Sequence, residues 1–283
     1  MNSKDFSYLG WSIKQQGDAI TVDQREYCEK IQPVSMDRRN KDLERPLTSR
    51  EKGLYQETLG KLLWISSQTR PDLSFDTMEL STYTSSVKVK HMDILNKVVK
   101  KVKFGPREMK FNRMDLEKDQ IKVIFYSDAS LGNLPNKAHS GRGYLVFLSD
   151  GHQASLIAWS SNKIKRVVHS VYGAETLGCV DGMSAAIYIR QLLSEMLYND
   201  ARKKVIPIYG FIDSNQLFQS ISSVKQPLDM RMRLDIAGIR ETVSSGEVDN
   251  ITWIPTREML ADSLTKKNSD IKKLKDVVEN GHF

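Results

Sequence analysis

The pattern of hydrophobic runs in residues 121–268 constrains the fold more than any other feature of the sequence. Three β-type runs come first, separated by short turns, which favours a pair of hairpins. Helical and strand patterns then alternate to the end of the segment. The expected elements are strands 121–127, 143–148 and 154–160, helix 172–197, strand 205–212, helices 214–222 and 228–245, strand 249–254 and helix 258–267. This order predicts an α/β fold with a mixed sheet and helices packed on it.

Residues 1–120 carry a different and mostly helical pattern. Two short strands are expected about the Gln16-Gly17-Asp18 turn, followed by a helix that begins near Asp23. Residues 35–50 are charged and contain Pro46 without an apolar period, which is typical of an exposed loop. Three helical patterns follow, over residues 54–63, 73–80 and 92–102. We therefore expect two domains, 1–120 and 121–268, followed by a C-terminal tail at 269–283.

Composition narrows the class of protein. The chain has 283 residues, of which 40% are hydrophobic and 27% charged, and no apolar run approaches the roughly 18–20 residues that cross a bilayer. The N-terminus lacks the pattern of a secretory signal, so an intracellular protein without membrane contact is expected. Cys28 and Cys179 are far apart and have no metal-ligand spacing, which argues against a disulfide framework or a zinc finger.

The net charge of +7 favours an anionic partner. The third helical pattern is the most basic one and includes Lys97 and Lys101. These lysines are candidates for contacts to phosphates, although a solvated helix face explains such a charge run equally well.

Two strands of the predicted sheet each end on an aspartate. Asp128 follows the run IKVIFYS, and Asp213 closes the run VIPIYGFI. An aspartate after a strand is usually a turn former, which is the simpler explanation for either residue alone. Open α/β sheets, however, place their functional sites at the carboxyl ends of strands.

Two further acids come from the predicted helices. Glu175 lies near the start of helix 172–197 and Asp262 lies in the run MLADSLTK. Taken singly, Glu175 is explained by the helix dipole and Asp262 by a solvent-facing helix start. Four acids at the edges of apolar elements would repel one another if they converged, and two Mg²⁺ ions about 3.5–4 Å apart would relieve that repulsion and support phosphodiester cleavage.

The order of several sequence blocks resembles a known family. The blocks are SDASLGN, SGRGYLVFL, IAWSSNKIKRVVHSVYGAETLG, FIDSNQLFQSI, MRMRLDIAGIRE and WIPTREMLADSLTK. Over residues 121–268 they are similar to the ribonuclease H domain at the end of the copia-type LTR-retrotransposon Pol polyprotein. FSYLGWSI and YQETLGKLLWISSQTRPDLSF resemble the end of the same family's reverse transcriptase, its thumb and connection region.

The resemblance implies an RNase H-like fold, a five-stranded mixed sheet with helices on both faces, preceded by a smaller, mostly helical region. It implies that Asp128 bridges two Mg²⁺ or Mn²⁺ ions. By motif position, Glu175 and Asp213 complete one metal site and Asp262 completes the other.

The sequence departs from the family's pattern at three places. The Glu-Ala-Glu stretch of the long helix appears as Gly173-Ala174-Glu175, and Arg233 replaces a histidine. The sequence contains no Tyr-x-Asp-Asp polymerase motif. The segment Phe211-Ile212-Asp213-Ser214 looks similar, but it has one Asp only. A polymerase active site is therefore not expected in this chain.

These observations predict a metal-dependent endonuclease that hydrolyses the RNA strand of RNA–DNA hybrids. Candidate substrate contacts are Ser214, Asn215, Trp159 and Ser160, although a helix cap is the more common role for a residue placed like Asn215, and a core position is the more common one for Trp159. A polymerase-bearing reverse transcriptase subunit is a further partner that the resemblance suggests. The location is expected to be intracellular, with the cytoplasm (as a virus-like particle) and the nucleus both open.

Three alternatives stay open at this point. The chain could be a non-catalytic nucleic-acid-binding remnant of a reverse transcriptase, in spite of its complete set of acids. An integrase-like transposase would need the order Asp, Asp, Glu, whereas here the Glu comes second. A purely structural connector predicts that no metal ion binds.

Overall fold

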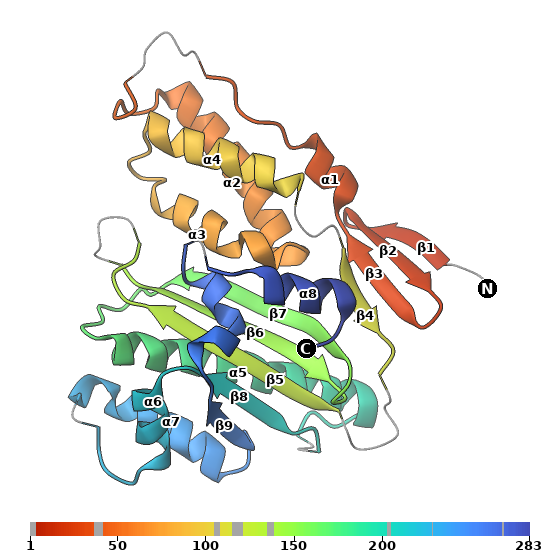
Figure 1. The fold of residues 1–283 in the computed structure, drawn as a ribbon, viewed down its shortest axis with the longest axis vertical. Coiled ribbons are helices and arrows are strands. Elements are labelled where there is room, and N and C mark those ends of the chain that lie inside the picture. Colours follow the sequence, from red (N-terminus) through yellow and green to blue (C-terminus); the bar gives the residue numbers. More distant parts are fainter. Residues whose placement is uncertain are drawn as a thin grey trace. The chain divides into compact units, whose positions relative to one another are not determined.

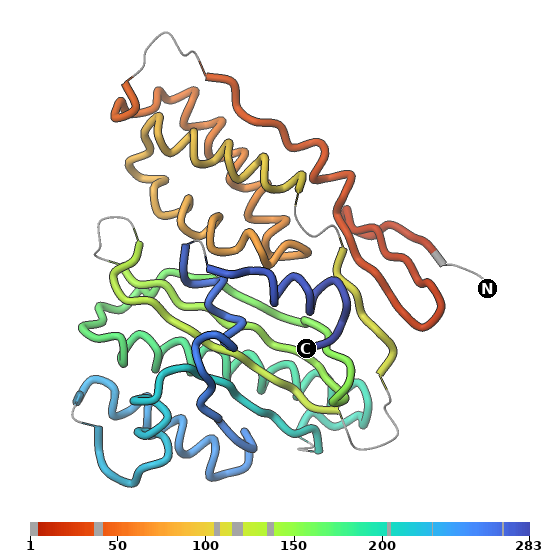
Figure 2. Tube along the Cα trace, viewed as in Figure 1, coloured from red at the N-terminus to blue at the C-terminus, as the bar shows by residue number. Residues whose placement is uncertain are grey.

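The chain divides into two units, Met1–Lys110 and Phe111–Phe283, each with its own hydrophobic core. They are seen here in a computed structural model (Figures 1 and 2). The structure describes residues 4–36, 42–104, 108–114, 121–134, 139–202, 205–227, 229–267 and 269–283. None of the helices within these ranges is long and apolar enough to cross a membrane.

Unit 1 combines a four-stranded sheet with a helical core. The elements are β1 (Lys4–Tyr8), β2 (Trp11–Gln16), β3 (Ala19–Asp23), α1 (Arg25–Lys30), α2 (Ser49–Gln68), η1 (Pro71–Leu73), α3 (Ser74–Thr82), α4 (Val89–Val102) and β4 (Met109–Asn112), which begins in unit 1 and ends two residues past its boundary. The strands lie in the order β1-β2-β3-β4. The predicted turn between two strands and the three predicted helices are confirmed, whereas β1 and β4 are elements that the sequence pattern did not predict.

The helices of unit 1 form where the local sequence favours them. Thr48 caps α2 in a capping box with Glu51, whose carboxylate accepts the Thr48 backbone N–H at 2.8 Å. Tyr55 and Leu62 of α2 and Leu95 of α4 are fully buried in one hydrophobic core. Of the predicted loop 35–50, residues 37–41 lie outside the described ranges.

Unit 2 is built on a five-stranded mixed sheet. The strands are β5 (Lys122–Ser130), β6 (Gly141–Ser149), β7 (Ala154–Lys163), β8 (Ile208–Ile212) and β9 (Asn250–Trp253), in the order β7-β6-β5-β8-β9. β6 is antiparallel to both of its neighbours, and β5, β8 and β9 are parallel. The predicted hairpins and the predicted mixed sheet are confirmed.

Helices cover both faces of this sheet (Figure 1). The helices of unit 2 are α5 (Val171–Tyr198), α6 (Asn215–Ser222), α7 (Arg233–Ser244) and α8 (Lys272–Asn280), with 3₁₀ turns η3 (Met230–Met232), η4 (Thr256–Glu258) and η5 (Leu260–Leu264). Phe125 of β5 points to α5, where it shares a core with Met183 and Ile236. Asp128 and its register partner Gly143 point to η5 on the other face.

The end of the chain differs from the sequence prediction. The predicted helix over residues 258–267 is wrong, because the structure has the two 3₁₀ turns η4 and η5 instead, separated by extended backbone at Met259. The Ser263 hydroxyl also donates to the Leu260 carbonyl, a local bond that competes with helical pairing. Beyond this point α8 forms in a segment for which no element was predicted, and its Leu274, Val277 and Val278 are buried.

Candidate metal centre

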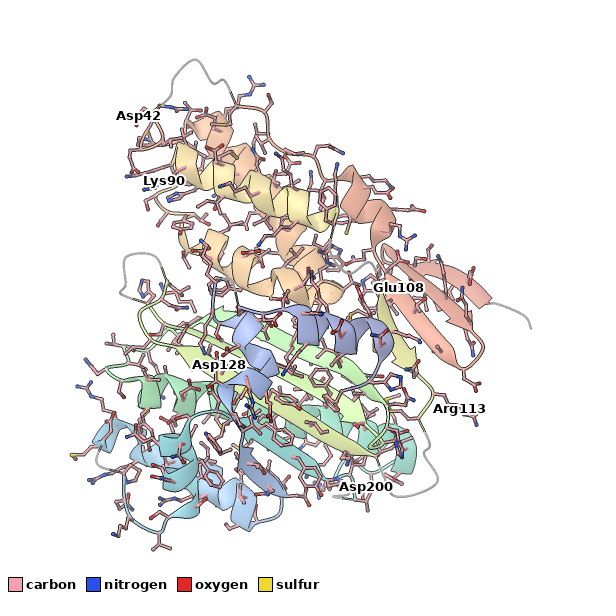
Figure 3. The ribbon with its side chains drawn as sticks, in the orientation of Figure 1. Asp42, Lys90, Glu108, Arg113, Asp128 and Asp200 are labelled. Atoms are coloured by element: carbon pink, nitrogen blue, oxygen red, sulfur yellow. The ribbon has the colours of Figure 1, made fainter. Side chains whose placement is uncertain are left out.

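Two neighbouring parallel strands bring Asp128 and Asp213 to the same end of the sheet. Asp128 lies near the end of β5 and Asp213 directly follows β8, its parallel partner. Together with Asp262 of η5, each offers a carboxylate oxygen, and the three oxygens lie within 4.8 Å of one another. Figure 3 shows Asp128 beneath the segment that carries η5. The fold therefore brings together three acids that are far apart in the sequence.

η5 reaches this position because it packs directly on β6. A Cβ atom added to Gly143 would lie 2.6 Å from the Leu264 Cβ, so only glycine permits this approach. The Ser161 hydroxyl donates to the Leu264 carbonyl at 2.6 Å, and the Ser130 hydroxyl donates to the Thr265 carbonyl at 3.0 Å. These bonds fix the backbone that carries Asp262.

Glu175 comes from α5, the helix on the other face of the sheet. Gly178 lets α5 approach β5 closely, since a Cβ atom there would lie 3.1 Å from the Asp128 carbonyl oxygen. The Glu175 side chain is buried, and its carboxylate accepts the backbone N–H of Ala129. Glu175 is not part of the three-aspartate group, but the charges of Asp128 and Asp213 act on it.

Burial makes the ionised form of these acids costly. It raises the pKa of Asp128 to about 7, against the opposing effects of the nearby Lys266 ammonium and of the Thr265 hydroxyl, which donates to Oδ2 of Asp128. Burial and the charge of Asp128 also raise the pKa of Glu175 well above its ordinary value. A positive charge close to these acids would therefore stabilise their ionised forms.

One cation of the chain already reaches the cluster. Lys266 donates to Oδ1 of Asp262, and its Nζ lies 3.5 Å from Oδ1 of Asp128. Burial alone would lower the pKa of Lys266, but the carboxylates of Asp128 and Asp262 outweigh it, so this pKa is raised.

Asp213 is held by the neighbouring strand β9 and by η4, the turn that follows it. The Thr256 hydroxyl donates to Oδ2 of Asp213 at 2.8 Å, and the Trp253 indole N–H donates to its backbone carbonyl at 3.0 Å. One carboxylate oxygen thus remains for another ligand. Carboxylate oxygens as donors suit a hard divalent cation, so these residues could hold a metal ion.

The predicted contacts after β8 have local structural roles. Ser214 is the N-cap of α6 and accepts the Leu217 backbone N–H at 3.3 Å. Asn215 is the first residue of α6 and is exposed. The capping role that the sequence suggested for Asn215 therefore belongs to Ser214.

The predicted contacts on β7 are half-buried. Trp159 pairs with Leu145 of β6, and Ser160 accepts the Asn162 side-chain amide at 2.6 Å. In unit 1, Lys97 and Lys101 are exposed on α4. Lys101 pairs with Asp76 at 2.8 Å. Substrate contact by these residues stays a prediction.

Sequence reasoning missed Thr265 and Lys266 as partners of the acids. Lys266 follows Asp262 by four residues, a spacing that often pairs opposite charges. That signal was present in the sequence, but it did not predict that Lys266 would also reach Asp128, which lies 138 residues away.

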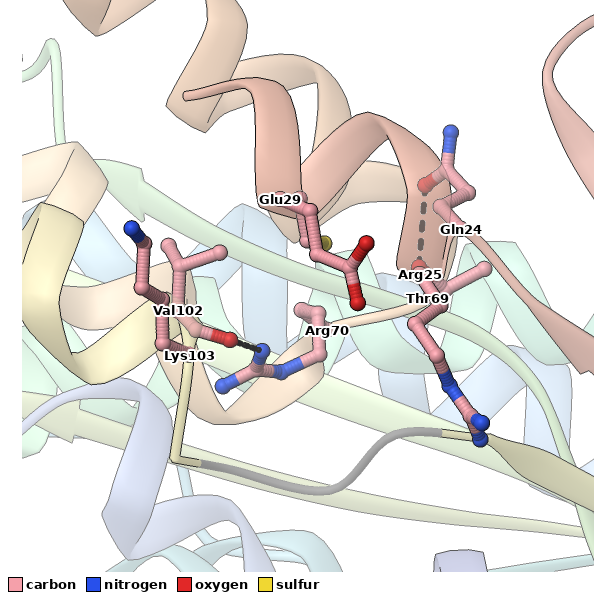
Figure 4. A pocket seen from close by; sticks show the side chains of 8 residues that line it. Gln24, Arg25, Glu29, Thr69, Arg70, Val102 and Lys103 are labelled. Carbon is pink, nitrogen blue, oxygen red and sulfur yellow. Dashed lines mark hydrogen bonds between the residues drawn. The ribbon is translucent and has the colours of Figure 1, made fainter. Parts of the chain in front are cut away.

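Unit 1 contains a separate pocket of about 270 Å³ (Figure 4). Its buried guanidinium, Arg70, donates to both carboxylate oxygens of Asp72 at 2.8 Å and to the Val102 carbonyl at 2.7 Å. The other lining residues are Gln24, Arg25, Cys28, Glu29, Thr69 and Lys103. Arg70 thus uses its donors to join the turn after α2 to the end of α4, which is a structural role.

Along the chain of unit 2, the antiparallel strands β5, β6 and β7 come first, α5 follows, and β8 and β9, which extend the sheet in parallel to β5, come last. This order defines an RNase H-like fold. The predicted fold class is therefore confirmed.

No protein-family model matches the sequence. The chain is 28% identical over 216 residues to the retrovirus-related Pol polyprotein from transposon RE1 of Arabidopsis thaliana, a match that covers 75% of this chain. It is 29% identical over 221 residues to the corresponding polyprotein from transposon RE2 of the same plant, covering 77% of this chain. The chain spans only 14% of the length of each polyprotein. This similarity confirms the predicted relationship to retrotransposon Pol polyproteins.

Among solved structures, the chain is similar to LC11-RNase H1 in complex with an RNA/DNA hybrid. The two are 19% identical with a TM-score of 0.37, over 54% of this chain and 99% of the other.

Proposed function

We propose that the chain is a metal-dependent ribonuclease H, derived from a retrotransposon Pol polyprotein, that cuts the RNA strand of RNA–DNA hybrids. The observation that carries the proposal is the convergence of Asp128, Asp213 and Asp262 at one end of the sheet, with buried Glu175 beside them. The sequence blocks that resemble a ribonuclease H domain provide these same four acids.

Each acid has a role that its surroundings support. Asp128 is the most buried of the acids, and its carboxylate lies within 4.8 Å of those of both Asp213 and Asp262, so it suits the position shared by two metal ions. Glu175 and Asp213 would complete one metal site and Asp262 the other. Bound Mg²⁺ or Mn²⁺ would supply activation of a water molecule and stabilisation of the leaving oxygen.

The remaining proposals concern binding. Ser214, Asn215, Trp159 and Ser160 are proposed to contact the hybrid, where 2′-hydroxyl groups distinguish RNA from DNA. Unit 1 is proposed to correspond to the end of a reverse transcriptase, with Lys97 and Lys101 of α4 contacting phosphates. A polymerase-bearing reverse transcriptase subunit is proposed as a further partner.

Cleavage of a labelled RNA–DNA hybrid by the full chain in Mg²⁺ tests the proposal. Asp213→Asn should abolish cleavage, because the substitution removes one charge from the metal site while the half-exposed position tolerates the amide. Asp276→Asn, the same change at an exposed position of α8, is the matched control and should cut like the wild type. EDTA should stop cleavage by all active chains.

The substrate panel separates the competing functions. Double-stranded DNA of the same sequence should not be cut, and its cleavage would point to a transposase-like enzyme instead. If the folded wild type binds the hybrid but does not cut it in Mg²⁺ or Mn²⁺, the chain is a binding protein rather than a nuclease.

A further inference from the structure

The Lys266 ammonium lies between two of the acids that are proposed to hold metal. It donates to Oδ1 of Asp262 and lies 3.5 Å from Oδ1 of Asp128. A divalent cation at the same oxygens would lie close to this ammonium, and the two positive charges would repel each other.

The backbone of this segment is held by hydrogen bonds on β5 and β7, whereas the lysine side chain is partly exposed. The carbonyls of Leu264 and Thr265 accept hydrogen bonds from Ser161 and Ser130, and the Thr265 hydroxyl donates to Asp128. The Lys266 side chain, in contrast, is 39% exposed. Its flexible four-carbon stem can therefore turn toward solvent without disturbing the turn that carries Asp262.

The Lys266 ammonium offsets part of the negative charge of the acidic cluster. Without a cation, the carboxylates of Asp128, Asp213 and Asp262 would face one another within 4.8 Å, with buried Glu175 beside them. Such a group is strongly destabilised unless positive charge reaches it. Lys266 supplies one positive charge from within the chain.

We infer that Lys266 is a built-in counter-cation, which stabilises the acidic cluster when no metal is bound and which a divalent ion has to displace from Asp128 and Asp262. The inference rests on the proposed metal-binding role of the cluster and adds a positioning residue to it. The ammonium acts through these two carboxylates and needs no contact with the nucleic acid.

Displacement predicts two effects of opposite sign when the charge of Lys266 is removed. Lys266→Met keeps much of the length of the side chain and lacks its charge. The metal-free variant should unfold at a lower temperature, since the acids then lack their internal cation. The same variant should bind Mn²⁺ and Mg²⁺ roughly ten-fold more tightly, since no ammonium competes for the carboxylates.

The experiment compares metal binding by calorimetry and unfolding temperature in EDTA, using the full chain without nucleic acid. Lys272→Met, at an exposed position of α8, is the matched control and should equal the wild type in both measurements. Lys266→Arg retains the charge and should bind metal with nearly the wild-type affinity.

A purely structural lysine would lower the unfolding temperature in the Met variant and leave metal affinity unchanged or weaker. That result, or the absence of metal binding by both chains, overturns the inference. The outcome is independent of the nuclease assay. A chain that shows the competition but never cuts a hybrid removes only the nuclease proposal, whereas hybrid cleavage with equal metal affinities removes only the role of Lys266.

Discussion

Asp128 is the most confined acid of the candidate metal centre. Its side chain is fully buried, the Thr265 hydroxyl donates to it, and Lys266 lies nearby. Burial raises its pKa to about 7, so a substantial fraction of this carboxyl carries a proton at neutral pH when no metal is bound. A metal ion that binds there at neutral pH therefore releases a proton.

This pKa predicts how the metal-free chain responds to pH. An unfolded aspartate titrates near pH 4, whereas folded Asp128 titrates at about 7. Between these values the folded chain holds more protons than the unfolded chain, so its free energy of unfolding should fall as the pH rises, and the loss is complete above pH 7.

Urea unfolding in EDTA at about pH 5 and about pH 8 measures this effect. The wild type should lose more unfolding free energy over this interval than Asp128→Asn, which cannot ionise at this position. Glu175 acts in the same direction, and the charge of Asp128 contributes to its raised pKa, so the difference between the chains reports the ionisation of Asp128 together with its effect on Glu175. The same pH dependence in both chains would contradict the assignment.

At the scale of elements, the contact between η5 and β6 positions the last acid. Gly143 lies opposite Asp128 in the register and directly beneath Leu264. A methyl group at position 143 would clash with the Leu264 Cβ. Both of these carbon atoms are bonded directly to the backbone, so no side-chain rotation can relieve the clash.

Gly143→Ala should therefore displace η5 and weaken the metal centre. We expect a loss of about 1–3 kcal/mol in the free energy of unfolding, together with weaker Mn²⁺ binding. Gly238→Ala is the matched control, since a Cβ atom at this position of α7 has no neighbour within 4 Å. The control should be stabilised by about 0.5–1 kcal/mol, as expected for alanine in a helix. Wild-type stability and metal affinity in Gly143→Ala would show that η5 tolerates the shift.

The comparison of these elements shows what the sequence can predict. The strands of unit 2 and α5 follow from long apolar runs, and the pairing of Asp128 with Asp213 follows from two strands that end on aspartates. η5 could not be distinguished from an α-helix, because five residues are too few to separate the two periods. α8 was missed although Leu274, Val277 and Val278 have helical spacing, since the segment around them is strongly polar.

The sequence predicted the four acids but not the position of Lys266, and this difference has a physical reason. The resemblance to known ribonuclease H blocks identified Asp128, Glu175, Asp213 and Asp262 by position. The contact from Lys266 to Asp128 depends on how η5 packs against β6, and no pattern along the chain encodes that packing.

At the scale of the whole molecule, the chain has two separate hydrophobic cores. Tyr55, Leu62 and Leu95 belong to the core of unit 1, and Phe125 and Ile236 belong to the core of unit 2. Each unit can therefore lose its packing without emptying the core of the other.

Calorimetry of the full chain should show two unfolding transitions. Added Mn²⁺ should raise the temperature of one transition only, because the acids all lie in Phe111–Phe283 and a ligand stabilises the state that binds it. Asp213→Asn should abolish this shift and leave the other transition in place. A single transition that moves with metal would mean that the two units unfold together.

The hydrogen bond from Thr265 to Asp128 joins residues 137 positions apart. The loop that this bond closes contains most of unit 2. Asp128 and Thr265 are therefore not expected to meet before the sheet between them in the sequence has been assembled. We therefore expect the candidate metal centre to form late in folding, because it needs both β5 and η5 in their final positions. During translation, a nascent chain cannot complete this candidate metal centre until the segment that carries Asp262 has left the ribosome.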